Sequence, residues 1–160
     1  MKFIITLLFF VGLSANLNLA YAASSGGDSG SNLYKSGKKL VIRAKKLEEK
    51  NKIAKAEKLY LKALGKLEKA YDKDKKNADI LNYLGFALRK TGDFEKAEKF
   101  YLKGLELDAG HLGINEYLGE LYVQTGRIEL AKERLQVLVG CKCEEYEELK
   151  ELIEGKKDLY

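Results

Sequence analysis

Cys141 and Cys143 are the only two cysteines of this chain, and a single lysine separates them. A disulfide across one residue needs a tight turn, and strained bridges tend to be oxidising and labile. Several interpretations therefore stay open: a structural bridge or inert thiols, a redox or thiol-exchange pair, a soft-metal site for an ion such as Cu(I), or a bridge between molecules. Because Cys143 begins a predicted helix, the helix dipole could lower the pKa of its thiol.

The remaining reactive residue types do not combine into a catalytic constellation. His111 is the only histidine, and we interpret it as a residue of a turn rather than a ligand. The chain has no glycine-rich phosphate loop after a strand, and no metal-ligand cluster beyond the cysteine pair. Paired glutamates such as Glu144-Glu145 are interpreted as helix surface. We expect a protein that is not an enzyme and needs no cofactor and no metal.

A repeat with a period of 34 residues organises the elements that carry these side chains. Apolar and small residues follow helical spacing in two runs within residues 78–111, and Thr91-Gly92-Asp93 between the runs predicts a turn with an aspartate cap. The recurring pairs are Leu84-Gly85 and Leu118-Gly119, Gly92 and Gly126, and Ala97 and Ala131. The pattern predicts a helical hairpin, in which Gly85 and Ala97 allow the two helices to approach closely.

The unit resembles the tetratricopeptide repeat family, whose period and pattern it shares. The matching residues are Leu81, Leu84-Gly85, Leu88, Gly92-Asp93-Phe94, Ala97, Tyr101, Leu105, Leu107 and Asp108, whereas Gly104 and Ala109 stand where alanine and proline are usual. The resemblance implies an all-α solenoid of about three repeats, at residues 37–77, 78–111 and 112–141. A polar-backed helix over about residues 144–154 would cap its end.

The first and third repeats depart from the pattern in ways that predict local structure. The motif around Ala56 copies that around Ala97 at a spacing of 41 residues (97 − 56), seven more than the period. Seven residues are two helical turns, so we expect them to lengthen the helix over residues 52–72 around 65–71. Asn51 is expected to form the turn after a helix over residues 33–50. Arg127 replaces the usual aspartate, so its helix should be less well capped.

The first 32 residues differ in character from the rest. Lys2, the apolar run of residues 3–13 and the small-residue site Ala20-Tyr21-Ala22 predict a signal peptide over residues 1–22, cleaved after Ala22. An uncleaved anchor is the alternative, although the run is short for one. Residues 23–32 are expected to be a flexible Ser/Gly linker, and residues 33–160 the repeat domain. The mature form should be exported to a bacterial periplasm and should not span a membrane.

Charge is unevenly distributed along the chain. Residues 35–77 contain 16 Lys/Arg and 6 Asp/Glu, a net +10, whereas residues 78–160 contain 12 and 17, a net −5. The basic part is either a solvated helix face or a surface for an anionic partner such as an acidic protein, lipid headgroups, a cell-wall polymer or nucleic acid. Nucleic acid is not expected, because no aromatic residues are interleaved with the lysines. Self-association of basic end to acidic end is a further hypothesis.

The resemblance also implies which residues face a partner, because the first helices of such repeats line a concave groove. The implied positions are Asp79, Asn82, Phe86, Arg89 and Lys90, then Glu116, Glu120, Val123 and Gln124, with Lys38, Val41, Lys45 and Glu48 from the first repeat. Phe86 is expected to anchor a peptide, with burial under the neighbouring repeat as the alternative. The set that clamps a chaperone's C-terminal carboxylate is not reproduced, because Val41 and Tyr83 occupy its positions.

These observations predict an exported, non-enzymatic scaffold that binds a protein or peptide of the cell envelope in its groove. The alternatives are a small thiol-active envelope protein that uses Cys141 and Cys143, and a self-assembling structural protein.

Overall fold

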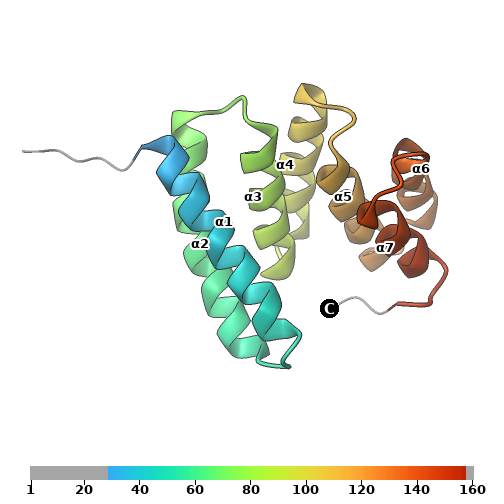
Figure 1. The fold of residues 1–160 in the computed structure, drawn as a ribbon, viewed down its shortest axis with the longest axis horizontal. Coiled ribbons are helices and arrows are strands. Elements are labelled where there is room, and N and C mark those ends of the chain that lie inside the picture. Colours follow the sequence, from blue (N-terminus) through green and yellow to red (C-terminus); the bar gives the residue numbers. More distant parts are fainter. Residues whose placement is uncertain (1–28, 158–160) are drawn as a thin grey trace, which may run out of the picture.

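The computed structural model describes residues 29–157, in which seven α-helices and no strands occur. The helices are α1 (Gly30–Glu48), α2 (Ile53–Lys73), α3 (Ala78–Lys90), α4 (Phe94–Leu107), α5 (Leu112–Gln124), α6 (Ile128–Leu138) and α7 (Glu144–Ile153). They form three antiparallel hairpins stacked side by side, with α7 against the last one (Figure 1). The all-α solenoid predicted from the repeat is confirmed. The predicted signal peptide lies outside the described residues.

Helix α1 begins earlier than the sequence predicts, inside the Ser/Gly segment. Ser29 is its N-cap, and the hydroxyl oxygen of Ser29 accepts a hydrogen bond of 3.3 Å from the backbone N–H of Asn32. A cap of this kind satisfies a donor that the first helical turn leaves free. Residues 30–32 are therefore helical, and the linker can comprise at most residues 23–29, of which 23–28 lie outside the described part of the chain.

The seven additional residues of the first repeat lengthen α2, as predicted. Helix α2 has 21 residues and α4 has 14, a difference of seven. The buried residues of α2 keep alternating spacings of three and four along its length: Ala56, Tyr60, Ala63, Leu67 and Ala70. Two extra turns therefore leave the same side of the helix against the core. Asn51, with φ 53°, forms the left-handed turn before α2, as expected.

The turn and cap residues of the second and third hairpins also act as predicted. Gly92 and Gly126 have φ values of 87° and 75°. The carboxylate of Asp93 accepts a hydrogen bond of 3.3 Å from the backbone N–H of Lys96 and so caps α4. Arg127, at the equivalent position of the third hairpin, makes no side-chain cap bond to α6.

Small residues permit close packing between helices. A Cβ atom at Gly85 would lie 2.5 Å from the ring of Tyr101, which itself is fully buried. Gly104 replaces the usual alanine for a reason that the structure reveals: a Cβ atom at this position would collide with Cδ1 of Ile114 on α5. The shape of the Ile114 side chain thus explains this departure from the repeat pattern.

Helix α7 covers the end of the stack. Its residue Leu149 is fully buried and lies against Gly119, where a Cβ atom would come within 2.5 Å of Leu149 Cδ2. Leu152 is also buried, whereas Glu144, Glu147 and Glu151 face solvent. The prediction of a polar-backed capping helix agrees with this placement. No helix among residues 29–157 combines the length and apolarity needed to cross a membrane.

Candidate partner-binding groove

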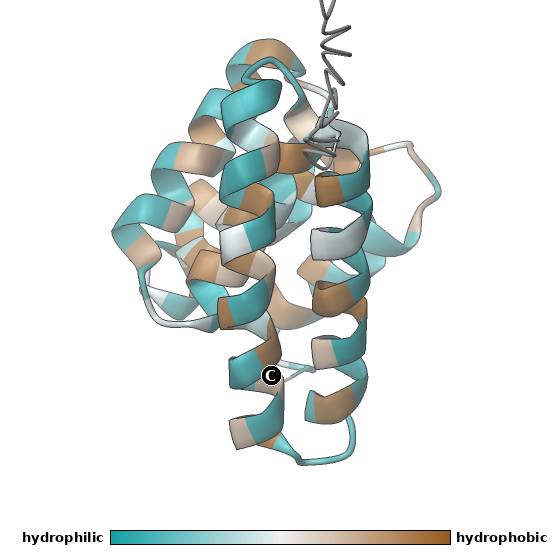
Figure 2. Cartoon of the chain, turned by 90° about the vertical axis from the view of Figure 1, so that its left-hand side faces the viewer, coloured by the Kyte–Doolittle hydropathy of each residue, from teal (hydrophilic) through white to brown (hydrophobic). Residues whose placement is uncertain are grey.

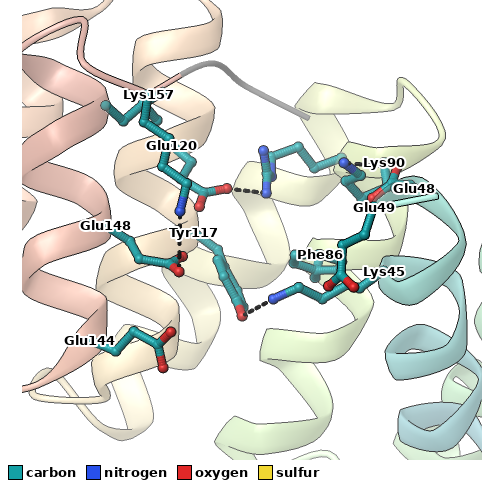
Figure 3. A pocket seen from close by; sticks show the side chains of 12 residues that line it. Lys45, Glu48, Glu49, Phe86, Lys90, Tyr117, Glu120, Glu144, Glu148 and Lys157 are labelled. Carbon is teal, nitrogen blue, oxygen red and sulfur yellow. Dashed lines mark hydrogen bonds and ion pairs between the residues drawn. The ribbon is translucent and has the colours of Figure 1, made fainter. Parts of the chain in front are cut away.

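A cavity of about 280 Å³ lies between the first helices of the hairpins and α7 (Figure 3). Twelve residues from α1, α3, α5, α7 and the segments that follow α1 and α7 line it: Lys45, Glu48, Glu49, Phe86, Arg89, Lys90, Tyr117, Glu120, Glu144, Glu148, Leu152 and Lys157. These helices are adjacent only in the tertiary structure, since more than 100 residues separate Lys45 from Lys157. The cavity is therefore a product of the stacking and not of any single repeat.

Two aromatic rings form the floor of the cavity. The ring centroids of Phe86 and Tyr117 are 4.7 Å apart, and Tyr60 packs behind Phe86 at 5.9 Å. Phe86 is 3% exposed, so its side chain is part of the core as well as of the cavity wall. Burial raises the pKa of the Tyr117 hydroxyl, and the nearby carboxyl of Glu116 adds to this effect. The floor is thus apolar, with one neutral phenol.

Lys45 carries the charge that lies over this floor. Its Nζ atom is 5.5 Å from the ring centroid of Phe86 and 5.6 Å from that of Tyr117, within the range of cation–π attraction. The same atom donates a hydrogen bond of 3.5 Å to the Tyr117 hydroxyl (Figure 3). Because Lys45 is exposed as a residue, its ammonium group can also donate to a ligand that enters the cavity.

Ion pairs fix the other charged residues around the cavity. Arg89, whose side chain is 3% exposed, pairs with Glu120, and Lys90 pairs with Glu48 at 2.9 Å. Lys157 and Glu148 pair at 3.2 Å. Burial lowers the pKa of Lys90, while the hydrogen bond with Glu48 acts in the opposite direction. These contacts join α1 to α3, α3 to α5, and α7 to the residues that follow it.

Comparison with known proteins assigns the second hairpin to a repeat family. Residues 78–111 match the family model of the tetratricopeptide repeat. This hairpin is a tetratricopeptide repeat. No curated protein matches its sequence significantly.

Solved tetratricopeptide-repeat structures share the fold of this chain at low sequence identity. The second tetratricopeptide-repeat domain of human RPAP3, solved with the HSP70 peptide SGPTIEEVD, gives a TM-score of 0.57 at 19% identity, covering 79% of this chain and 98% of that one. The Arabidopsis OM64 domain gives 0.56 at 13%, covering 78% and 99%. The Yersinia enterocolitica translocator chaperone SycD gives 0.52 at 16%, covering 80% and 85%. At these identities the likeness concerns the fold alone.

The groove residues implied by the family resemblance separate into two groups. Phe86, Arg89, Lys90 and Glu120 line the cavity together, as do Lys45 and Glu48 of the first repeat. Phe86 and Arg89 are buried, at 3% and 5% exposed, so both act as framework residues rather than as exposed contacts. The alternative interpretation of Phe86, burial between repeats, is the one that the structure supports.

The other implied positions lie away from the cavity. Asp79 is exposed near the start of α3, where a carboxylate oxygen is 3.4 Å from Nε2 of His111. His111 itself caps α5, because its Nδ1 accepts a hydrogen bond from the backbone N–H of Ile114. Asn82 is buried beside Gly113, and Gln124 is exposed at the last turn of α5. Residues of α3 and α5 that were expected to share the groove therefore do not all line the cavity.

Sequence reasoning missed the contribution of α7 and of Tyr117. We interpreted α7 only as a cap, yet Glu144, Glu148 and Leu152 line the cavity. Tyr117 stands 34 residues after Tyr83, at the same position of the next repeat. This equivalence to Tyr83 was the signal in the sequence that could have indicated a place for Tyr117 in the groove.

Three carboxyl groups gather at the α5–α7 side of the groove. Glu116, Glu120 and Glu148 each place one oxygen within 4.8 Å of the others, an arrangement with the dimensions of a cation site. The chain nonetheless balances these groups itself. Glu120 is paired with Arg89 and Glu148 with Lys157. Burial, the charge of Glu120 and a hydrogen bond with Glu148 raise the pKa of Glu116 to about 9, so that it is neutral at pH 7.

The two cysteines lie in the turn before α7. A disulfide bond joins them, with Cα atoms 5.2 Å apart, and Lys142 between them has φ 51°. Cys143 is the N-cap residue of α7, as the predicted helix start implies. Redox and soft-metal chemistry would require the reduced pair and stay predictions.

Proposed function

We propose that this tetratricopeptide-repeat protein binds a peptide segment of a protein partner in the cavity between α1, α3, α5 and α7, and that it does so as an exported scaffold of the cell envelope. The cavity carries this proposal: a concave site of about 280 Å³ with an aromatic floor and one exposed ammonium group over it. Sites for small molecules and peptides combine apolar surface with a few oriented polar groups in this way.

The chemistry of the lining suits recognition better than catalysis. Arg89, Lys90 and Lys157 are engaged with glutamates of the chain, so their role in the site is to hold the helices at fixed separations. The bound segment would place an apolar side chain against Tyr117, whose ring is supported from below by the buried Phe86. Its carbonyl or carboxylate oxygen would accept a hydrogen bond from Nζ of Lys45. We therefore propose an interaction module and not an enzyme.

Two further observations support parts of the proposal. The RPAP3 domain, which has the same fold, was solved with a bound HSP70 peptide, and SycD is named as a translocator chaperone. Export rests on the sequence of residues 1–22, with its basic start, apolar run and Ala20-Tyr21-Ala22 site. The partner would then be a protein of the cell envelope.

Adjacent lysines provide a matched test of the groove. Lys45 lies over the aromatic floor, whereas Lys46 is exposed one position further along α1 and does not line the cavity. Peptides selected from a random-peptide phage library on the purified protein should bind Lys45→Glu at least about tenfold more weakly than wild type, as expected for loss of one desolvated charged contact. Binding to Lys46→Glu should stay unchanged.

The opposite outcomes would contradict the groove. If the selected peptides bind both charge-reversal variants equally well, they bind elsewhere on the molecule. If no peptide is enriched over an unrelated helical protein, peptide recognition itself is wrong. Circular dichroism of both variants shows whether the fold is kept.

A thiol-active role is the second candidate, favoured by the position of Cys143 at the N-terminus of α7. After reduction, a helix N-terminus stabilises a thiolate and so increases its reactivity. Thiol titration at neutral pH should then show one fast-reacting cysteine, which Cys143→Ser removes and Cys141→Ser keeps. Two slow thiols in the reduced protein would rule this role out.

A further inference from the structure

Helices α1 and α2 carry basic stripes on their exposed sides. Along α1, basic residues recur at intervals of four, four and three, and along α2 at intervals of three, four, four, three and four. All of them are exposed. We name this set the basic face: Lys35, Lys39, Arg43 and Lys46 of α1, and Lys55, Lys58, Lys62, Lys66, Lys69 and Lys73 of α2.

The helical period puts each stripe on one side of its helix. At 100° per residue, the six lysines of α2 fall within an arc of about 80°, and the four residues of α1 within a similar arc. From Lys55 to Lys73 the stripe is about 27 Å long, at about 1.5 Å per residue. These are continuous rows and not scattered charges.

Contacts of the two helices show that both stripes face away from the helices that α1 and α2 pack against. Helix α1 meets α2 through Gly37 and Leu67, and it faces α3 through Tyr34, whose ring contacts that of Tyr83. Helix α2 meets the second hairpin through Tyr60 and Tyr71. The sides that remain are turned away from the rest of the stack. Figure 2 looks on to this surface, where α1 and α2 lie side by side in front of the other helices.

The basic face contains no carboxylate. Helix α1 has no Asp or Glu before Glu48, its last residue. In α2, Glu68 lies toward α4: it contributes to the raised pKa of Lys96, although the hydrogen bond that Lys96 donates to Asp93 is the main cause. Apart from Lys66, which has an interaction within the chain, none of the ten residues forms an ion pair among residues 29–157. Among residues 29–157, ion pairs therefore do not relieve the mutual repulsion of the other nine.

We infer that the basic face binds the surface of an anionic phospholipid bilayer. Helices α1 and α2 lie side by side on this surface, so that both basic stripes can approach the plane of a bilayer. Ile42, 42% exposed between Lys39 and Lys46, adds an apolar group of the kind that enters the headgroup region. Each basic residue near such a surface strengthens binding about fivefold, so that ten together suffice for stable attachment at moderate salt.

Other occupants fit the surface less well. A single-stranded nucleic acid needs aromatic side chains for base stacking, and the aromatic residues of α1 and α2 face the other helices. A second copy could offer the acidic outer side of α7, where Glu144, Glu147 and Glu151 are exposed. Three carboxylates cannot neutralise ten cations, and exposed ion pairs each contribute little.

Vesicle flotation tests the inference with the full chain. Wild type should float with vesicles of equal amounts of phosphatidylglycerol and phosphatidylcholine at low salt, and high salt should release it, because screening weakens the attraction. The variant with Lys58→Glu, Lys62→Glu and Lys69→Glu should partition about a hundredfold less, from three losses of about fivefold. The matched control reverses three exposed lysines outside the face, Lys99→Glu, Lys103→Glu and Lys132→Glu. This control variant should lose far less vesicle binding than the variant of the basic face.

Several outcomes would overturn the inference. Equal losses in the two triple variants would show a dependence on net charge alone. Binding to double-stranded DNA or polyglutamate in solution, without flotation on anionic vesicles, would assign the face to a nucleic acid or an acidic protein. Salt-insensitive flotation on phosphatidylcholine alone would point to the apolar residues 3–13, which every variant shares. Circular dichroism excludes unfolding of the variants as the cause.

Discussion

Glu116, beside the groove residues Glu120 and Glu148, holds its proton at neutral pH. Its side chain is 4% exposed, and burial, the charge of Glu120 and the hydrogen bond with Glu148 raise its pKa to about 9 from an ordinary value of 4.5. A protonated Glu116 can donate the hydrogen bond that a second carboxylate beside it requires. The residue thus behaves as a neutral donor between α5 and α7, although its type suggests a charge.

The raised pKa predicts a pH-dependent stability. Between about pH 4.5 and pH 9 the folded chain binds this proton more tightly than the unfolded chain does. The stabilisation is therefore complete below the unfolded value and is lost as the pH rises toward 9. Replacement Glu116→Gln keeps a neutral donor without a titratable group. Its free energy of unfolding, relative to wild type, should increase steadily from pH 5 to pH 9.

Urea unfolding across this pH range checks the prediction. Glu106→Gln, on the exposed side of α4, serves as the control for the loss of one carboxylate. A constant difference between wild type and Glu116→Gln at every pH would show that Glu116 is ionised in the folded protein.

At the scale of the helices, glycines have opposite roles that depend on what faces them. Gly85 in α3 lies against Tyr101 of α4, with no space for a side chain, whereas Gly65 in α2 has no atom within 4 Å of an added Cβ. Both replace better helix formers at a cost of about 1 kcal/mol. Only the first glycine is therefore required by packing.

Alanine substitutions should consequently change stability in opposite directions. Gly65→Ala should raise the free energy of unfolding by about 0.5–1 kcal/mol through helix propensity. Gly85→Ala should lower it by about 1–3 kcal/mol, because the Tyr101 ring must move out of its place. Thermal and urea unfolding of the two variants measures the sign of each change in the free energy of unfolding. Stabilisation by Gly85→Ala would mean that α3 and α4 are less closely packed than described.

At the scale of the whole molecule, the charge asymmetry of the sequence becomes an asymmetry of the two ends of the stack. The outer side of α1 and α2 is basic, and that of α7, at the other end, is acidic (Figure 1). Such ends would attract one another in a head-to-tail manner, which generates open chains rather than closed rings. Self-association and membrane binding would compete for the same basic face.

The membrane inference predicts that the protein stays monomeric without lipid. Light scattering should give the mass of one chain at low and at high salt, because the few exposed carboxylates of α7 provide weak pairing. An apparent mass that increases as the salt concentration is lowered would instead support head-to-tail assembly. Charge reversal at Glu144, Glu147 and Glu151 should then abolish the increase. The same reversals leave the basic face intact and should not affect flotation.

Features that depend on neighbouring residues along the chain could be predicted from the sequence. The hairpin of residues 78–107, the cap at Asp93, the missing side-chain cap at Arg127, the left-handed turn at Asn51 and the seven added residues of α2 all follow from helical period and backbone preference. These are short-range effects, and the residues involved lie within one or two turns of each other. The repeat spacing extended them to an all-α solenoid.

The groove was decided by the tertiary structure. The family resemblance put Phe86, Asn82 and Asp79 on one expected surface. In the structure Phe86 is buried in the floor of the cavity, Asn82 is buried away from it, and Asp79 is exposed near the start of α3. The proton on Glu116, the orientation of Lys45 over two rings and the use of α7 as a wall each need side chains from distant parts of the chain. Burial and electrostatic coupling depend on how helices stack, which no local pattern encodes.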